Sequence, residues 1–371
     1  MDSRERLSVL QVGKFYPPAA GGMERMLQML CEGERAAGVN SRALVANHER
    51  RTVHEVVNGV PVTRVASVAR GGAVEWCPTF PRWLCRHDAD VIVVHEPNPI
   101  ALVANMLCRP TVPTVVWFHS EVVRPRLQYK AFYEPFLSFT LRRAARIVVS
   151  SPALAEQAQA LRPYRGKCVV IPFGFDPERF APAASPVASG EPPLVLFVGR
   201  LVEYKGVDVL LRALAGLENV RAVLVGDGPR RAALEELATD LGLAGRVTFA
   251  GEVSDDRMAQ LYAGCDLFVL PSVTRAEAFG LVQLEAMAAG KAVVSTSVPT
   301  GVPWVNQHER TGLIVPPGDV PALRKAIQRL LTDPDLRIRM GREGRARVAR
   351  DFTPARMIQQ MLALYREVIG R

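Results

Sequence analysis

The sequence predicts an α/β protein made of two doubly wound domains, and three observations support this prediction. The chain has 371 residues, more than one ordinary hydrophobic core accommodates. Short apolar runs typical of buried strands alternate with helical segments along its length. A stretch rich in Pro, Ala and Ser at 181–193 is typical of a linker. We therefore expect one domain at 1–185 and a second at 186–353.

Composition places the chain among ordinary globular proteins. Hydrophobic residues make up 49% and charged residues 22%, and no run approaches the roughly 18 apolar residues of a membrane span. The N-terminus is charged and leads into a short strand, so we expect no secretory signal. The six cysteines include no Cys-x-x-Cys pair. This pattern predicts neither a zinc site nor a disulfide framework, and it fits a reducing cytoplasm.

Charge is distributed unevenly between the two predicted domains. Residues 1–185 hold 23 Lys and Arg against 16 Asp and Glu, or +7. The remainder holds 46 − 23 = 23 against 37 − 16 = 21, or +2. A basic first domain suits an anionic partner such as a membrane surface, a phosphorylated lipid or a nucleic acid, or it reflects a basic proteome. No nucleic-acid-binding motif is present, so we expect no nucleic-acid partner.

The first domain opens with a predicted strand at 7–12, a loop at 13–22 and a helix at 23–37. The loop lacks Gly-x-Gly-x-x-Gly, which disfavours a dehydrogenase. Gly21 and Gly22 could offer backbone amides to a phosphate or could form only a tight turn. Further strands are expected at 41–46, 60–65, 90–95 and 114–119, and segments that begin as a strand and end as a loop are expected at 146–152 and 168–176.

Two histidines follow predicted strands of this domain. His95 and His119 stand at strand ends, where ligands of open α/β sheets bind. Either could donate to a sugar hydroxyl, or could be a hydrogen-bonded structural residue.

A basic and aromatic segment covers residues 124–146. It carries six Lys and Arg against one acid, with interleaved Phe, Tyr and Leu. Such a helix can lie on an anionic bilayer, or it can face the core with a solvated basic rim. We hypothesise that it docks the protein at a membrane.

The second domain starts with a strand at 194–199, and the loop that follows carries Arg200 and Lys205. Two cations beside a helix N-terminus suit a diphosphate, although solvated surface residues are the alternative. Later strands are expected at 221–225, 247–253, 266–270, 292–296 and 312–315, and helices near 320–332, 335–350 and 354–369.

The stretch Glu277-Ala-Phe-Gly-Leu-Val-Gln-Leu-Glu285 carries two carboxylates at a strand-to-helix junction. We expect Glu277 in the loop and Glu285 about one turn into the helix. A diphosphate could rest on the amides of Phe279, Gly280 and Leu281, with Glu285 on a ribose and Glu277 on a sugar. Alternatively, Glu277 caps the helix and Glu285 is a solvated surface residue.

This stretch also resembles the paired-glutamate motif of the retaining glycosyltransferases of family 4, and the resemblance spans nearly the whole chain. It implies a GT-B fold, with two Rossmann-like domains facing a cleft and the last helix, 354–371, packing back on the first. It implies that donor binds the second domain and acceptor the first. It also implies retention of configuration, with neither metal nor cofactor. We expect no side chain to act as a nucleophile, because in this family the departing phosphate helps to deprotonate the incoming hydroxyl.

The resemblance also assigns roles to individual residues. The expected catalytic residues are Glu277, His119, Arg200 and Lys205. The expected substrate-binding residues are Gly21, Gly22, Arg200, Lys205, Asp227, Val253, Glu277, Phe279, Gly280, Leu281 and Glu285. Asp227 and Val253 would border the nucleotide base, although Asp227 could equally be a helix cap.

Several further motifs are similar to a bacterial subgroup of α-mannosyltransferases that use GDP-mannose and build exopolysaccharide and O-antigen units. They are Lys14-Phe-Tyr-Pro-Pro18 with Gly21-Gly22, His95-Glu-Pro-Asn-Pro99, Phe118-His-Ser-Glu121 and Pro299-Thr-Gly-Val-Pro-Trp-Val-Asn306. Glu121 departs from the expected Asp, which puts the acceptor in doubt.

We therefore expect a hexosyltransferase that moves mannose from GDP-mannose to a lipid-linked acceptor, as a peripheral protein on the cytoplasmic face of the plasma membrane. A UDP-sugar-dependent glucosyl or N-acetylglucosaminyl transferase, a phosphorylase and an epimerase remain alternatives.

Overall fold

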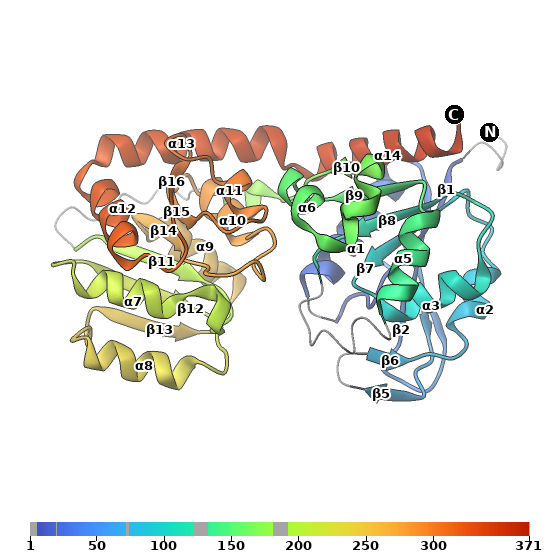
Figure 1. The fold of residues 1–371 in the computed structure, drawn as a ribbon, viewed down its shortest axis with the longest axis horizontal. Helices are drawn as coiled ribbons and strands as arrows, with labels where there is room; N and C mark the ends of the chain where they lie inside the picture. The colour runs from blue at the N-terminus through green and yellow to red at the C-terminus, as the bar shows by residue number, and fades with distance from the viewer. Residues whose placement is uncertain (1–5, 20, 72–73, 122–132, 181–191, 371) are drawn as a thin grey trace. The chain divides into compact units, whose positions relative to one another are not determined.

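The computed structural model describes residues 6–19, 21–71, 74–121, 133–180 and 192–370. The chain divides into two compact units (Figure 1). The first holds residues up to Gly174 together with Pro354–Arg371, and the second holds Phe175–Thr353. The division falls before the expected boundary at residue 185. Most of the expected linker lies outside the described residues.

The first unit is built on an eight-stranded sheet with the order β10-β9-β8-β7-β1-β2-β4-β3. All neighbours are parallel except β3, which pairs antiparallel with β4. The chain leaves β1 in one direction and returns to its other side at β7, so a topological switch point lies between β1 and β7. The strands are β1 Ser8–Val12, β2 Asn40–Ala46, β3 Val53–Val57, β4 Val60–Val65, β7 Val91–Glu96, β8 Thr114–Phe118, β9 Arg146–Val149 and β10 Cys168–Val170.

The helices of this unit cover both faces of the sheet. They are α1 Gly22–Ala36, α2 Phe80–Cys85, α3 Pro99–Cys108, α5 Glu134–Arg143, α6 Pro152–Gln157, the 3-10 helix η1 Gln159–Lys167 and α14 Pro354–Ile369. Apolar side chains such as Val12 and Ile92 pack under α2 and α3. Helix α14, coloured red in Figure 1, belongs to this unit and packs on α1.

The second unit holds a six-stranded parallel sheet with the order β13-β12-β11-β14-β15-β16. Its switch point lies between β11 and β14. The strands are β11 Leu194–Val198, β12 Arg221–Val225, β13 Val247–Gly251, β14 Leu267–Leu270, β15 Val293–Thr296 and β16 Gly312–Val315.

The helices of the second unit alternate with these strands. They are η2 Pro177–Phe180, η3 Glu203–Lys205, α7 Val207–Ala215, α8 Arg231–Asp240, α9 Asp255–Gly264, α10 Val282–Ala288, α11 Val302–Val305, α12 Val320–Thr332 and α13 Pro334–Asp351. One core of fully buried residues, among them Phe197, Leu211 and Val294, joins the sheet to α7 and α12.

The expected strands and the three final helices are confirmed to within a few residues. The structure adds β3 and a small antiparallel pair, β5 Ala69–Gly71 with β6 Val74–Trp76, which the sequence analysis did not predict. Of the basic segment, only 133–146 is described, and it forms α5 and the start of β9. Arg124, Arg126, Lys130 and Phe132 lie outside the described residues.

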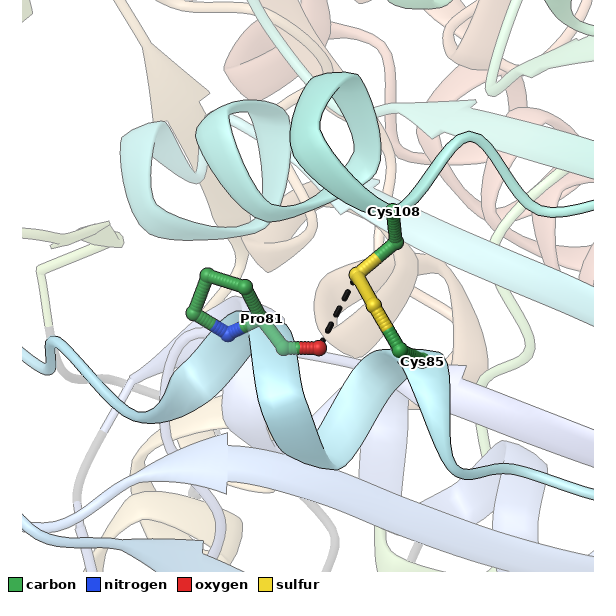
Figure 2. Close-up of a disulfide and its surroundings, with 3 residues drawn as sticks. All are labelled: Pro81, Cys85 and Cys108. Atoms are coloured by element: carbon green, nitrogen blue, oxygen red, sulfur yellow. Dashed lines mark hydrogen bonds between the residues drawn. A yellow bond between two sulfur atoms is a disulfide. The ribbon is translucent and has the colours of Figure 1, made fainter.

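The prediction that the cysteines form no disulfide is wrong. Cys85 at the end of α2 and Cys108 at the end of α3 are bonded to each other, with their Cα atoms 5.3 Å apart (Figure 2). Cys108 Sγ also lies 2.9 Å from the carbonyl oxygen of Pro81. The pair was missed because the two cysteines meet only through the packing of α2 on α3, so their spacing in sequence carries no signal. Among the described residues, no helix is long and apolar enough to cross a membrane.

Candidate active site

A buried ion pair stands at the switch point of the second sheet. Lys205, the last residue of η3, follows β11, and Glu277 follows β14. Lys205 Nζ lies 2.6 Å from Glu277 Oε2, and both side chains are only 10% exposed. Ser272 Oγ donates to the same carboxylate oxygen at 3.0 Å. Because β11 and β14 are parallel neighbours, their carboxyl ends bring these loops together at the edge where ligands bind.

The two loops are joined by their backbones. Val273 N donates to the carbonyl oxygen of Tyr204 at 2.8 Å. Gly206 has a φ of +67°, and a Cβ added to it would overlap the Pro271 carbonyl. Only glycine therefore allows this close approach, which brings Lys205 to Glu277.

The turn before α10 leaves backbone donors without a protein acceptor among the described residues. Gly280 has a φ of +72°, and an added Cβ would lie 2.7 Å from Gln283 Nε2 and from Leu270 Cδ2. In the described part of the chain, no acceptor contacts the backbone N–H of Gly280 or Leu281. Leu281 is the N-cap of α10, and no side chain caps the helix. Unpaired N–H groups of this kind are typical of anion-binding turns, and the contact with a diphosphate stays a prediction.

Glu285 lies inside α10, as expected, and is half-buried. The Tyr262 hydroxyl donates to Glu285 Oε2 at 2.7 Å. Neither alternative interpretation of the motif holds. Glu277 contacts Lys205 and Ser272 rather than capping the helix, and Glu285 is anchored rather than freely solvated.

Three further predicted residues of the second unit, Arg200, Asp227 and Val253, lie on loops. Arg200 is exposed, directly after β11 and Gly199. Asp227 accepts from its neighbour Gly228 N at 2.6 Å and pairs with Arg231 at 3.4 Å. The N-cap of α8 is Arg230, so Asp227 is not the helix cap that the sequence left open. Val253 precedes α9 and is half-buried.

The first unit places His119 and His95 in contact. His119 Nε2 lies 3.0 Å from His95 Nδ1, and the His119 ring packs beside the rings of Trp117 and Phe173 at centroid distances of 5.3 and 5.5 Å. Burial lowers the pKa of His95 to about 3, and burial beside His95 places the pKa of His119 well below its ordinary value. Both rings are therefore neutral at physiological pH.

The glycine pair opens α1 in the same unit. Gly21 is the N-cap of α1, and Gly22 is its first residue. A Cβ on Gly21 would overlap the carboxylate of Glu24, whose pKa is raised by burial. Glu24 therefore lies directly against the glycine pair whose backbone amides were expected to offer a contact to a phosphate.

Sequence reasoning missed several partners of these residues. Ser272 and Tyr262 hold the two glutamates, and Gln11 contacts His95 Nε2 at 2.9 Å. One signal was available, because Gln11 is a polar residue in the middle of an apolar strand. In the part of the chain that the structure describes, no cluster of three or more His, Cys, Asp or Glu suits a metal ion.

Comparison with known proteins identifies the family. The model described as "Glycosyl transferase 4-like domain" matches residues 21–174, and "Glycosyl transferases group 1" matches residues 182–347. The chain is 33% identical to D-rhamnosyltransferase WbpZ of Pseudomonas aeruginosa, over 94% of this chain and 92% of that protein. It is 30% identical to O-antigen chain mannosyltransferase C of Escherichia coli, over 97% and 98% respectively.

A third relative is a GDP-mannose-dependent alpha-(1-6)-phosphatidylinositol monomannoside mannosyltransferase of Mycobacterium tuberculosis, 36% identical over 91% of this chain and 92% of that protein. Among solved structures, sucrose-phosphate synthase of Thermosynechococcus elongatus matches with a TM-score of 0.81 and 26% identity, covering 98% of this chain and all of that one. The chain therefore belongs to the family 4 glycosyltransferases of the GT-B fold.

Proposed function

We propose that this glycosyltransferase transfers mannose from GDP-mannose to a lipid-linked glycan, with retention of anomeric configuration, in exopolysaccharide or O-antigen assembly. Two relatives named as mannosyltransferases, one of them GDP-mannose-dependent and one acting on O-antigen, support the donor and the pathway.

The observation that carries this proposal is the Lys205–Glu277 pair at the switch point of the second sheet. In the proposal, the donor diphosphate lies against Lys205, Arg200 and the free N–H groups of Gly280 and Leu281. These groups neutralise the charge that grows as the diphosphate departs, without a metal ion or cofactor. Glu277 Oε2 is held by Lys205 and Ser272, and its Oε1 then accepts hydrogen bonds from sugar hydroxyls.

Glu285 takes the ribose hydroxyls in this arrangement, from a position fixed by Tyr262. The departing phosphate itself accepts the proton of the incoming hydroxyl, so no side chain has to act as a nucleophile. Phe279 contributes to the turn, and Asp227 and Val253 border the nucleotide base.

We place the acceptor glycan in a cavity of about 490 Å³ in the first unit, beside the loop that leads to Gly21 and Gly22. Its lining includes Phe15 and His48, whose rings lie 4.5 Å apart. The charged side chains of the lining pair with one another, as in Arg51–Glu49 and Arg64–Glu55. A neutral, polar ligand with one apolar face, such as a sugar ring, suits such a lining. Phe15→Ala should raise the KM for acceptor and leave the KM for donor unchanged.

We further propose that the first unit docks on an anionic membrane. Trp76 on β6 is 64% exposed, and Leu107 on α3 is 63% exposed. Strand β6 packs on α3, and α3 packs on α5. Arg109 and Arg143 lie over the ring of Phe139 at 5.9 and 5.8 Å. Exposed apolar side chains beside arginines suit the headgroup region of a bilayer with acidic lipids.

Liposome flotation tests this docking. Trp76→Ala with Leu107→Ala should weaken binding to vesicles that contain acidic lipid, and so should reversal of charge at Arg142 and Arg143. Ile338→Ala is the matched control, because Ile338 is 47% exposed and lies on α13 of the second unit. Unchanged flotation of the first two variants would reject the docking surface.

A thermal-shift panel of GDP-, UDP- and ADP-sugars tests the donor. We expect stabilisation by GDP-mannose. The D-rhamnosyltransferase relative favours a second candidate, because rhamnose is 6-deoxymannose, so GDP-rhamnose belongs in the same panel. Stabilisation by UDP-sugars alone would instead indicate a UDP-sugar-dependent glucosyl- or N-acetylglucosaminyltransferase. Sugar release that needs phosphate, or donor consumption without acceptor, would point to a phosphorylase or an epimerase.

A further inference from the structure

Buried polar side chains of the first unit form one connected chain of hydrogen bonds. Gln11 on β1, Glu34 on α1 and Tyr365 on α14 are fully buried, and His95 and His119 are 1% and 5% exposed. Polar groups in such a core are costly unless each has a partner. Each of these buried polar groups therefore needs a hydrogen-bond partner.

The chain of contacts runs from the sheet edge into the core. His119 Nε2 lies 3.0 Å from His95 Nδ1, and His95 Nε2 lies 2.9 Å from Gln11 Oε1. Gln11 Nε2 donates to Glu34 Oε1 at 2.8 Å and to the Tyr365 hydroxyl at 3.0 Å. Tyr365 donates its own proton to Glu34 Oε1 at 2.7 Å, and Ser41 donates to Glu34 Oε2 at 2.6 Å.

The direction of each hydrogen bond follows from the chemistry of the groups. Gln11 presents its amide nitrogen to Glu34 and Tyr365, so its carbonyl oxygen accepts from His95 Nε2–H. A neutral imidazole carries one proton, so His95 Nδ1 is an acceptor and His119 Nε2–H donates to it. His119 Nδ1 is then unprotonated, and it has no hydrogen-bond partner in the described part of the chain.

We propose that Gln11, Glu34 and Tyr365 are positioning residues that hold His119 as the Nε2–H tautomer, so that Nδ1 accepts a hydrogen bond from a sugar hydroxyl of the substrate. The rings of Trp117 and Phe173, which lie nearly parallel to His119 and contact it, restrict the plane of the ring. The low pKa of both histidines keeps the rings neutral, which is the condition for a tautomer to matter. The choice of a sugar hydroxyl rests on the proposed function, whereas the tautomer does not.

Nitrogen-15 NMR of the imidazole rings in the ligand-free protein tests the tautomer directly. Wild type should show protonated Nε2 and unprotonated Nδ1 for His95 and His119. Gln11→Met removes the acceptor at similar volume and should give a mixture of tautomers. Gln11→Glu restores an acceptor for His95 Nε2–H and should restore the wild-type tautomer, which a purely space-filling role would not require.

A matched control separates this effect from general loss of a buried hydrogen bond. Thr140→Val removes a buried hydroxyl that lies 3.2 Å from Asn105 Nδ2, in the same unit but outside the hydrogen-bond chain. It should leave the tautomers and the transfer rate unchanged. Tyr365→Phe removes one hydrogen bond to Glu34 and should have a smaller effect than Gln11→Met.

Kinetics identify the hydroxyl. With the nucleotide sugar selected by the thermal-shift panel, Gln11→Met should lower kcat/KM about tenfold, equivalent to one hydrogen bond of about 1.4 kcal/mol. A series of deoxy-sugar substrates should contain one hydroxyl position at which wild type and Gln11→Met become equal, because that hydroxyl is the partner of Nδ1.

Two results would overturn the inference. One is a wild-type His119 protonated on Nδ1, and the other is an unchanged tautomer in Gln11→Met. If no nucleotide sugar is turned over, the proposed function fails while the NMR result still decides the tautomer. A third outcome concerns the substrate alone. If the tautomer shifts in Gln11→Met but the variant transfers sugar at the wild-type rate, then Nδ1 does not bind the substrate.

Discussion

Replacing Lys205 with Met should be among the most destabilising single changes in the second unit. The substitution keeps an unbranched apolar side chain but removes the ammonium that lies 2.6 Å from Glu277 Oε2. Among the described residues, the carboxylate of Glu277, which is 7% exposed, then keeps only the Ser272 hydroxyl as a partner. Breaking one side of a buried ion pair costs about 3–5 kcal/mol, because the remaining charge is left uncompensated.

An exposed ion pair in the same unit provides the control. Arg329 on α12 pairs with Glu309, and both side chains are 47% exposed. Arg329→Met should lower the free energy of unfolding by less than about 1 kcal/mol, since exposed pairs are screened by water. Removing both charges of the buried pair, in Lys205→Met with Glu277→Leu, should recover much of the stability lost in the single variant.

Urea denaturation measures the free energy of unfolding of each variant. Hydrogen exchange of peptides that contain β14 then reports the loss of stability within the second unit. The reasoning is refuted if Lys205→Met is no more destabilising than Arg329→Met, or if the double variant equals the sum of its single variants. By the same argument, Glu277→Ala should abolish transfer and also destabilise the second unit.

Three further predictions concern charge, backbone and donor binding. Burial raises the pKa of Glu34 from 4.5 to about 7, so the folded state binds a proton that the unfolded state lacks between these values, and stability falls as pH rises through this window. Glu34→Gln removes this contribution, and its stability relative to wild type should increase by about 1 kcal/mol between pH 6 and 8, measured by urea denaturation; a constant difference would contradict the shift. Gly280→Ala should abolish donor binding and lower the melting temperature, since a Cβ would lie 2.7 Å from Leu270 Cδ2 at a φ of +72°, whereas an unaltered calorimetric titration would show that the turn tolerates it. Arg200→Ala with Lys205→Ala should eliminate donor binding, and Arg200→Ala alone should weaken it without loss of stability because Arg200 is exposed; wild-type titrations of the double variant would refute the phosphate assignment.

The local pattern of apolar residues in the sequence was sufficient to predict most helices and strands of the fold. Apolar runs such as those of β7 and β8 predicted buried strands, and the helical spacing after Gly280 placed Glu285 in a helix. Strand β3 was missed because its side chains are largely exposed, so no apolar pattern marks it. The β5–β6 pair was missed because each strand has only three residues.

The partners within the site could not be predicted, because they meet through sheet topology. Lys205 and Glu277 are joined only where β11 and β14 become neighbours across the switch point. In the pairing of β1 with β7, Gln11 lies opposite Val93, and His95 follows two residues later on β7. The side chains of Gln11 and His95 therefore lie on the same face of the sheet and can contact each other. Spacing in a single sequence carries no information about either pairing.

Tyr365 has a consequence for how the protein folds during synthesis. It contacts Glu34 and Gln11 from α14, yet Phe175–Thr353 separates α14 from the rest of its unit in the sequence. A nascent chain that has emerged only as far as Gly174 therefore leaves Glu34 and Gln11 without a phenol partner. The ribosome must therefore translate all of the second unit before the buried core of the first unit can be completed.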